Sequence, residues 1–208
     1  MMGDYANTIG ILIFDDVEEL DFVGPWEVFT MSNEVFAHRG EGAPVDRVLL
    51  ISETAGLIRC AKGMRVQSDT GFADCPALDV LLVPGGQGTR REVDNPAMLE
   101  WIADVAAGCR WVTSVCTGSL LLTEAGPAAG RRVTTHWGFA DQLKERGKAE
   151  VLTDYRYVRD GNVVTAAGVS AGIDMALWLV GQLHGPDHAR ATQKGMQYDP
   201  APPYQADI

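Results

Sequence analysis

The sequence lacks the features of several protein classes. It has 208 residues but only 4 Cys, with no CxxC pair and no Cys–His spacing typical of zinc ligands, so neither a disulfide scaffold nor a metal site is expected. No apolar run approaches the roughly 20 residues of a membrane-spanning helix, and the segment before Thr8 has no basic stretch like that of a signal peptide. These absences predict a cytoplasmic protein with reduced thiols and no membrane partner.

Basic residues are also scarce. The 17 Lys and Arg against 28 Asp and Glu give a formal net charge of −11. Nucleic-acid grooves need clustered Lys and Arg, so we expect no nucleic-acid partner. The length and the 46% hydrophobic content are those of an ordinary globular chain. We therefore expect one domain over residues 1–208, with an extended tail from about residue 198.

Short apolar runs alternate with longer amphipathic or apolar segments. Such runs are typical of strands buried on both faces, and their alternation with helices predicts a three-layer α/β/α sandwich. The expected sheet is flavodoxin-like and mostly parallel, with ligands beyond the carboxyl ends of its strands. Strands are expected at 9–14, 48–52, 80–83, 111–115, 132–134 and 150–152, hairpins at 57–67 and 155–166, and helices at 20–36, 96–107, 117–125, 138–146, 171–184 and 186–197.

Cys116 lies where a buried strand stops and a helix begins, within the run VTSVCTGS of residues 112–119. A nucleophile held on such a strand–helix turn is called a nucleophile elbow. The unpaired N–H groups at a helix N-terminus are expected to favour a thiolate there. Cys60, Cys75 and Cys109 lie in a hairpin strand, a turn and a helix end, where structural roles suffice.

Two further segments are expected at the same edge of the sheet. Gly85, Gly86 and Gln87 follow the strand at 80–83, and their backbone could form an oxyanion cradle with the N–H of Thr117, although a sharp turn explains the glycines equally well. Asp21 follows the first strand and is the carboxylate expected to move protons to and from Cys116. An N-cap role for Asp21 is an equally good explanation.

His136 and Trp137 follow the strand at 132–134 and are candidate substrate-binding residues. A histidine at a strand end is more often structural than catalytic. His184 and His188 are four residues apart, but Gly185 and Pro186 interrupt the helix between them, which argues against a metal site.

Together these motifs resemble the ThiJ/PfpI superfamily, whose fold is that of the class I glutamine amidotransferases. The resemblance extends from about Ile9 to about His184, and within the superfamily the chain is most similar to the isocyanide hydratases. The motifs that carry it are LDFVGP at 20–25, FADCP at 72–76, PGG at 84–86, TSVCTGS at 113–119, TTHW at 134–137, AGID at 171–174 and YDPAPP at 198–203.

This resemblance implies a cofactor-independent hydratase acting on a small molecule. Cys116 would add to an organic isocyanide, Asp21 would move the proton, and Thr117 would orient the reacting groups, giving an N-substituted formamide through a covalent thioimidate. It also implies a homodimer, with Trp26, Phe29 and Phe36 as apolar surface.

Other functions of the same superfamily stay open. They are another cysteine hydrolase, a glyoxalase or deglycase, and a non-catalytic sensor of metabolite or redox state. Thr117 stands where the superfamily's proteases carry His after the cysteine. The sensor domains of AraC-type regulators share the LDxxGP and SVCTGS motifs, but the short segment after His184 and the charge of −11 argue against a DNA-binding regulator.

Overall fold

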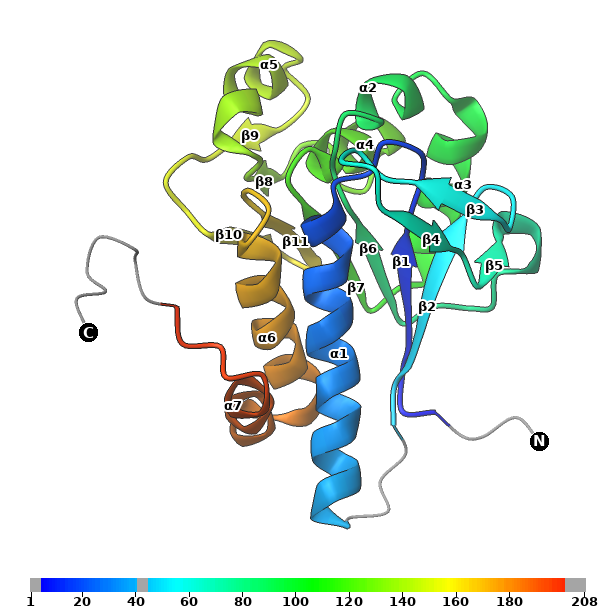
Figure 1. The fold of residues 1–208 in the computed structure, drawn as a ribbon. Helices are drawn as coiled ribbons and strands as arrows, with labels where there is room; N and C mark the ends of the chain where they lie inside the picture. The colour runs from blue at the N-terminus through cyan, green and yellow to red at the C-terminus, as the bar shows by residue number, and fades with distance from the viewer. Residues whose placement is uncertain (1–4, 41–44, 201–208) are drawn as a thin grey trace.

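The computed structural model describes residues 5–40 and 45–200 (Figure 1). Its main sheet has the strand order β10-β11-β7-β6-β1-β2-β5, and every neighbouring pair is parallel except the β10–β11 hairpin. The expected mostly parallel sheet is therefore confirmed. Its strands are β1 (Thr8–Leu12), β2 (Arg47–Ser52), β5 (Thr70–Gly71), β6 (Val80–Val83), β7 (Trp111–Val115), β10 (Tyr157–Asp160) and β11 (Val163–Ala166).

Helices cover both faces of this sheet, which confirms the three-layer sandwich. In Figure 1, α1 (Glu19–Arg39), α6 (Ala171–His184) and α7 (Pro186–Gly195) lie together on one face, and α3 (Pro96–Gly108) and α4 (Gly118–Ala125) lie on the other. Between them, the central strands β6, β7 and β11 are buried at every position. Burial on both faces explains why these strands read as continuous apolar runs.

Smaller elements decorate the ends of the sheet. One is the expected hairpin near residue 60, and another is a two-stranded parallel pair beside α5 that projects from the top of the molecule in Figure 1. These elements are β3 (Leu57–Arg59), β4 (Arg65–Gln67), η1 (Phe72–Asp74), α2 (Thr89–Glu92), β8 (Arg132–Val133), η2 (Trp137–Phe139), α5 (Ala140–Glu145) and β9 (Glu150–Val151).

The order of the strands places the site. After β1 the chain moves outward to β2, and it later returns to the other side of β1 with β6 and continues to β7 and β11. In open α/β sheets, ligands bind at the carboxyl ends of the strands where the order reverses. Asp21 follows β1, Gly85 follows β6 and Cys116 follows β7, so all three are brought to this crevice.

The long helix α1 differs from its prediction. It begins at Glu19 rather than at residue 20, and Pro25 lies inside it rather than at its first position. Acidic Glu19 and Asp21 in the first turn suit the positive end of the helix dipole. Gly24 and Pro25 instead serve close packing on α6, because a Cβ on Gly24 would come within 2.9 Å of Ile173 Cγ1.

The predicted apolar surface of α1 is reduced to Trp26, because Phe29 is fully buried and Phe36 stacks on His188 with ring centroids 3.7 Å apart. The short helix α2 was not predicted from sequence. Most of the expected tail from about residue 198 falls at 201–208, outside the described residues.

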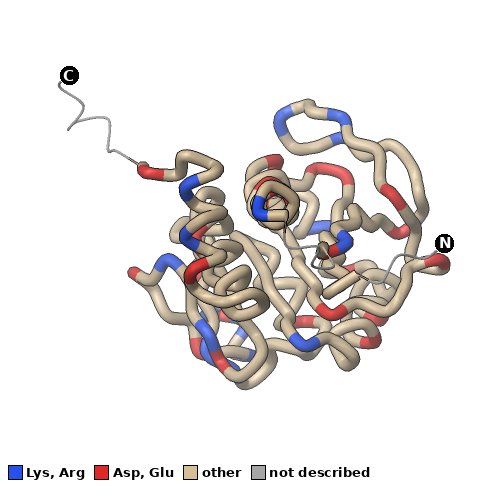
Figure 2. Tube along the Cα trace, turned by 90° about the horizontal axis from the view of Figure 1, so that it is seen from below, with Lys and Arg blue, Asp and Glu red and all other residues tan. Residues whose placement is uncertain are grey.

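Charged residues are scattered over the surface. In the view of Figure 2, Lys and Arg positions are interspersed with Asp and Glu positions along the trace. In the described part of the chain, no helix is both long and apolar enough to cross a membrane.

Candidate active site

Cys116 occupies a strained turn between β7 and α4. Its φ angle is +57°, a left-handed conformation that few residues other than glycine adopt. The backbone is held there from both sides: its N–H donates to the Ala166 carbonyl (3.1 Å), and its carbonyl accepts from the hydroxyls of Ser119 (3.1 Å) and Thr135 (3.0 Å). The predicted nucleophile elbow is therefore present in the geometry of the chain.

Asp21 lies across the crevice from this elbow, in the first turn of α1. Its side chain is fully buried, and Oδ2 accepts the N–H of Gly85 at 2.9 Å. No N-cap bond is formed by Asp21; the N-cap of α1 is Glu18, which also makes no side-chain cap. The side chain of Asp21 is thus directed toward the β6 loop and the thiol instead of its own helix, contrary to the N-cap alternative.

The pKa values of these two groups are coupled. Burial raises the pKa of Asp21 to about 7, against the opposing effects of the Gly85 N–H and of a hydrogen-bonding interaction with the Cys116 thiol. The other oxygen, Oδ1, is buried and has no hydrogen-bond partner of ordinary geometry among the described residues. A carboxyl group in this state is able to take up and release a proton near neutral pH.

The pKa of the Cys116 thiol is higher than its position at a helix N-terminus predicts. Burial, followed by the charge of Asp21, raises the pKa of Cys116 to about 12, so the expected stable thiolate is wrong. The N–H groups of Thr117 and Val169 and the Thr117 hydroxyl lower the pKa of the thiol, but burial outweighs them. The resting pair is a thiol beside a carboxyl group that titrates near neutrality.

The glycine loop after β6 supports the pair, and two of the N–H groups expected in the oxyanion cradle have other partners. The Gly85 N–H is already bonded to Asp21, and the Gly86 N–H donates to Thr117 Oγ1 at 3.1 Å. A Cβ on Gly85 would lie 2.5 Å from Thr117 N and 2.9 Å from Cys116 Cβ. Glycine is therefore required for the loop to approach the elbow, and the backbone donors that face the sulfur come from Thr117 and Val169.

A cavity of about 340 Å³ opens above Cys116. It contains most of the predicted site residues: Thr117 at its base, Gly86 and exposed Gln87 from the loop, and His136 and Trp137 from the segment after β8. Trp137 is 84% exposed at its rim. Asp21 and Gly85 lie behind the elbow, within reach of the thiol but not in the cavity wall.

Among the cavity residues that the sequence did not predict, Arg90 and Val169 reach the elbow. Arg90 projects from α2 and donates through Nη1 to Thr117 Oγ1 at 3.4 Å, and Val169 presents its N–H to the thiol. Arg90 follows the glycine loop by a few residues, so its place after β6 was a usable signal. Val169 has a φ of +41°, and nothing in its sequence context indicates that conformation.

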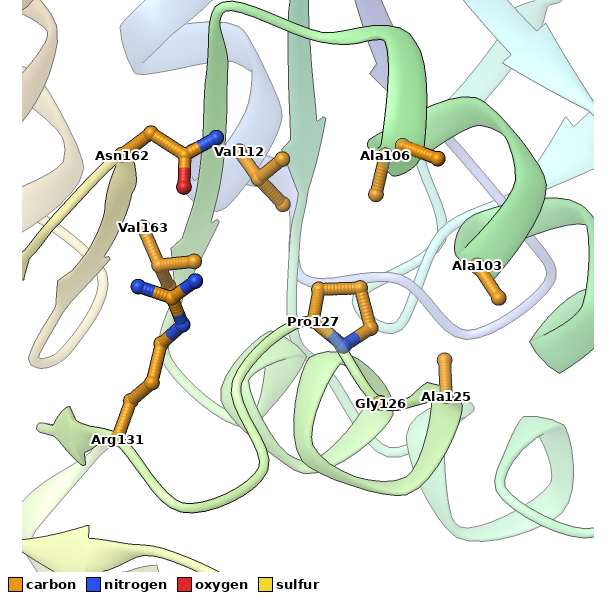
Figure 3. Close-up of a pocket in the computed structure, with 10 residues that line it drawn as sticks. Ala103, Ala106, Val112, Ala125, Gly126, Pro127, Arg131, Asn162 and Val163 are labelled. Carbon is orange, nitrogen blue, oxygen red and sulfur yellow. The ribbon is translucent and has the colours of Figure 1, made fainter.

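A second cavity of about 400 Å³ lies at the other end of the strands (Figure 3). Val112 and Val163 lie at the start of β7 and β11 there, as the second and the first residue of these strands, and small residues such as Ala103, Ala106 and Ala125 line it. Its polar side chains are engaged: Arg131 Nη1 donates to the Asp160 carbonyl at 2.9 Å and Asn162 Nδ2 to the Cys109 carbonyl at 3.5 Å. It has no nucleophile, and we place the candidate site at Cys116. In the described residues, no group of three or more His, Cys, Asp or Glu side chains could hold a metal ion.

The comparison with known families agrees with the elbow and the sheet order. A family model described as "DJ-1/PfpI family" matches residues 7–182. The chain belongs to the DJ-1/PfpI family. A solved member of this group, a ThiJ/PfpI family protein from Pseudomonas syringae, superposes with a TM-score of 0.85 and 32% identity, covering all of this chain and 80% of the other.

Relatives within the DJ-1/PfpI family carry different functional names. An isonitrile hydratase from Pseudomonas putida is 40% identical over 201 residues, which span 97% of this chain and 82% of that enzyme. A glutathione-independent glyoxalase from Caenorhabditis elegans is 26% identical over 93% of this chain and 97% of that protein. The HTH-type transcriptional regulator CdhR of Pseudomonas aeruginosa is 34% identical over 67% of this chain, which spans 41% of the regulator's length.

Proposed function

We propose that this protein is an isocyanide hydratase, which adds water to an organic isocyanide to give an N-substituted formamide. The observation that carries the proposal is the buried pair of Asp21 and Cys116, in which a carboxyl group with a pKa near 7 neighbours a thiol on a strained elbow. The 40% identity with a relative named isonitrile hydratase supports the same reaction. Thr117, where a histidine would suit a cysteine protease, agrees with it.

The first step forms the carbon–sulfur bond. The terminal carbon of an isocyanide carries a lone pair and is only weakly electrophilic, so attack on it must be accompanied by protonation of that carbon. Asp21 takes the thiol proton as Cys116 sulfur attacks, and then delivers this proton to the carbon. The product is a thioimidate, R–N=CH–S–Cys116, and no group has left.

The second step consumes water. Asp21 removes a proton from the water that attacks the thioimidate carbon and passes this proton to the nitrogen, which gives R–NH–CH(OH)–S–Cys116. Collapse of the resulting adduct breaks the carbon–sulfur bond, and the hydroxyl proton returns to sulfur as R–NH–CHO leaves. The N–H groups of Thr117 and Val169, which face the sulfur, stabilise negative charge on it in both steps. Dividing one difficult addition into two easier steps is the purpose of covalent catalysis.

The test is a product assay with the purified protein. Cyclohexyl isocyanide is mixed with the wild type and with Cys116→Ala, and the formyl proton of N-cyclohexylformamide is followed by NMR. The proposal expects formamide from the wild type only. Consumption of methylglyoxal with no formamide would instead indicate the glyoxalase function that another relative is named for. Equal formamide production by Cys116→Ala would show that Cys116 is not the nucleophile.

A further inference from the structure

Arg90 is held at the edge of the reactive cavity by three oxygen atoms and a ring. Its Nη1 donates to the Gly86 carbonyl (2.9 Å), to Thr89 Oγ1 (3.1 Å) and to Thr117 Oγ1 (3.4 Å). Its Cζ lies 4.8 Å from the centroid of the Phe139 ring. Because these contacts fix the position of the guanidinium, little side-chain freedom would be lost when it binds a ligand.

The Nε and Nη2 groups of the Arg90 guanidinium make no hydrogen bond among the described residues. All of its hydrogen bonds in the described residues use Nη1, whereas a guanidinium carries five N–H donors. No carboxylate among the described residues pairs with it. The neighbouring Arg91 differs, because its guanidinium is paired with Glu92 and Asp16.

The charge that Arg90 brings to the cavity is not cancelled there. The acidic residue that lines the same cavity is Glu18, and its carboxylate forms an ion pair with Lys62. His136 accepts the Gly138 N–H on Nδ1 at 3.2 Å, which leaves Nε2 as the ring nitrogen free to face a ligand. The cavity therefore offers an unpaired cation and hydrogen-bond donors, although the whole chain has a net charge of −11.

We propose that Arg90 binds a carboxylate on the N-substituent of the substrate, so that the preferred substrates are short isocyanides that carry an acid group. This inference rests on the proposed hydratase function. Guanidinium and carboxylate groups form two parallel charge-assisted hydrogen bonds, which suits the unused Nε and Nη2 donors. The contact of Arg90 with Thr117, the residue after the nucleophile, places the cation a short distance from the reacting carbon.

The experiment compares kcat/KM for isocyanoacetate and for its neutral methyl ester. The wild type is expected to favour the acid by about tenfold, as a charge-assisted contact of this kind would give. Arg90→Gln should remove this preference, with a loss in kcat/KM about tenfold larger for the acid than for the ester. Arg91→Gln, which removes the same charge from the next residue, is the matched control and should leave the preference unchanged. Added salt should weaken the preference in the wild type.

Three results would overturn the inference. One is a wild type that hydrates the ester at least as well as the acid. Another is an equal loss of kcat/KM for both substrates in Arg90→Gln, which would mean that Arg90 only holds the glycine loop in position. The third is failure of the wild type to hydrate either of these two isocyanides; the proposed function falls with the inference only if cyclohexyl isocyanide gives no formamide either.

Discussion

At the scale of single residues, the buried carboxyl group of Asp21 lowers the stability of the folded protein when it is charged. A carboxyl group whose pKa is raised from 3.8 to about 7 binds more protons in the folded than in the unfolded protein between those pH values. Its contribution therefore becomes less favourable as pH rises through that window, and above it the buried charge opposes folding. Such a cost is expected at a site selected for reactivity.

Replacement of Asp21 by Asn should separate activity from folding. We expect kcat/KM for isocyanide hydration to fall by about 100-fold or more, since a general acid–base group is lost. The free energy of unfolding at pH 8 should be unchanged or higher than that of the wild type, because the buried charge is removed while Asn still accepts the Gly85 N–H. Glu27→Gln, at an exposed position of the same helix, is the control. A variant that unfolds but keeps its specific activity would contradict the role of Asp21.

The pH profile should report the same carboxyl group. Below its pKa of about 7 both members of the pair are protonated and the thiol has no base, so kcat/KM should rise through pH 7 and then level off. A profile of initial rates from pH 5 to 9 on a neutral isocyanide measures this. An acid limb that persists in Asp21→Asn would mean that another group titrates.

At the scale of elements, the glycine loop after β6 packs closely against the elbow after β7. Gly85→Ala should force them apart, because the new Cβ would lie 2.5 Å from Thr117 N and 2.6 Å from Thr117 Oγ1. We expect a loss of about 1–3 kcal/mol in unfolding free energy by chemical denaturation and a large fall in activity. Gly108→Ala at the end of α3 has no atom within 4 Å of its new Cβ and should stay within about 0.5 kcal/mol of the wild type. Equal unfolding free energies and activities for the two variants would refute this close packing.

The elements that sequence reasoning predicts well are those with a strong local pattern. Strands β6 and β7 and helix α6 are found at the predicted residues because continuous apolar runs reflect burial on both sides. The position of Pro25 was mispredicted because its tolerance inside α1 depends on packing against α6, a contact distant in sequence. Cys116, Asp21 and the glycine loop could be identified from strand ends. The raised thiol pKa could not, because it depends on burial that only the folded chain creates.

At the scale of the whole molecule, α1 keeps two partly exposed apolar side chains for the predicted homodimer. Leu20 and Trp26 are each 38% exposed on this helix. We expect light scattering to give twice the mass of one chain, and Trp26→Glu to shift the protein toward the monomer. Leu57→Glu, at a 62% exposed position on the β3–β4 hairpin, is the control. A monomeric wild type at micromolar concentration would contradict the prediction.

The proposed reaction attaches the isocyanide covalently to Cys116 through the Asp21–Cys116 pair. The most direct measurement is the intact mass of the protein after rapid mixing with cyclohexyl isocyanide and quenching, followed by peptide mapping. We expect a transient gain equal to the full mass of the isocyanide, on the peptide that contains Cys116 and absent from Cys116→Ala. Formamide produced at the full rate with no such adduct at any mixing time, and with Cys116→Ala equally active, would contradict it.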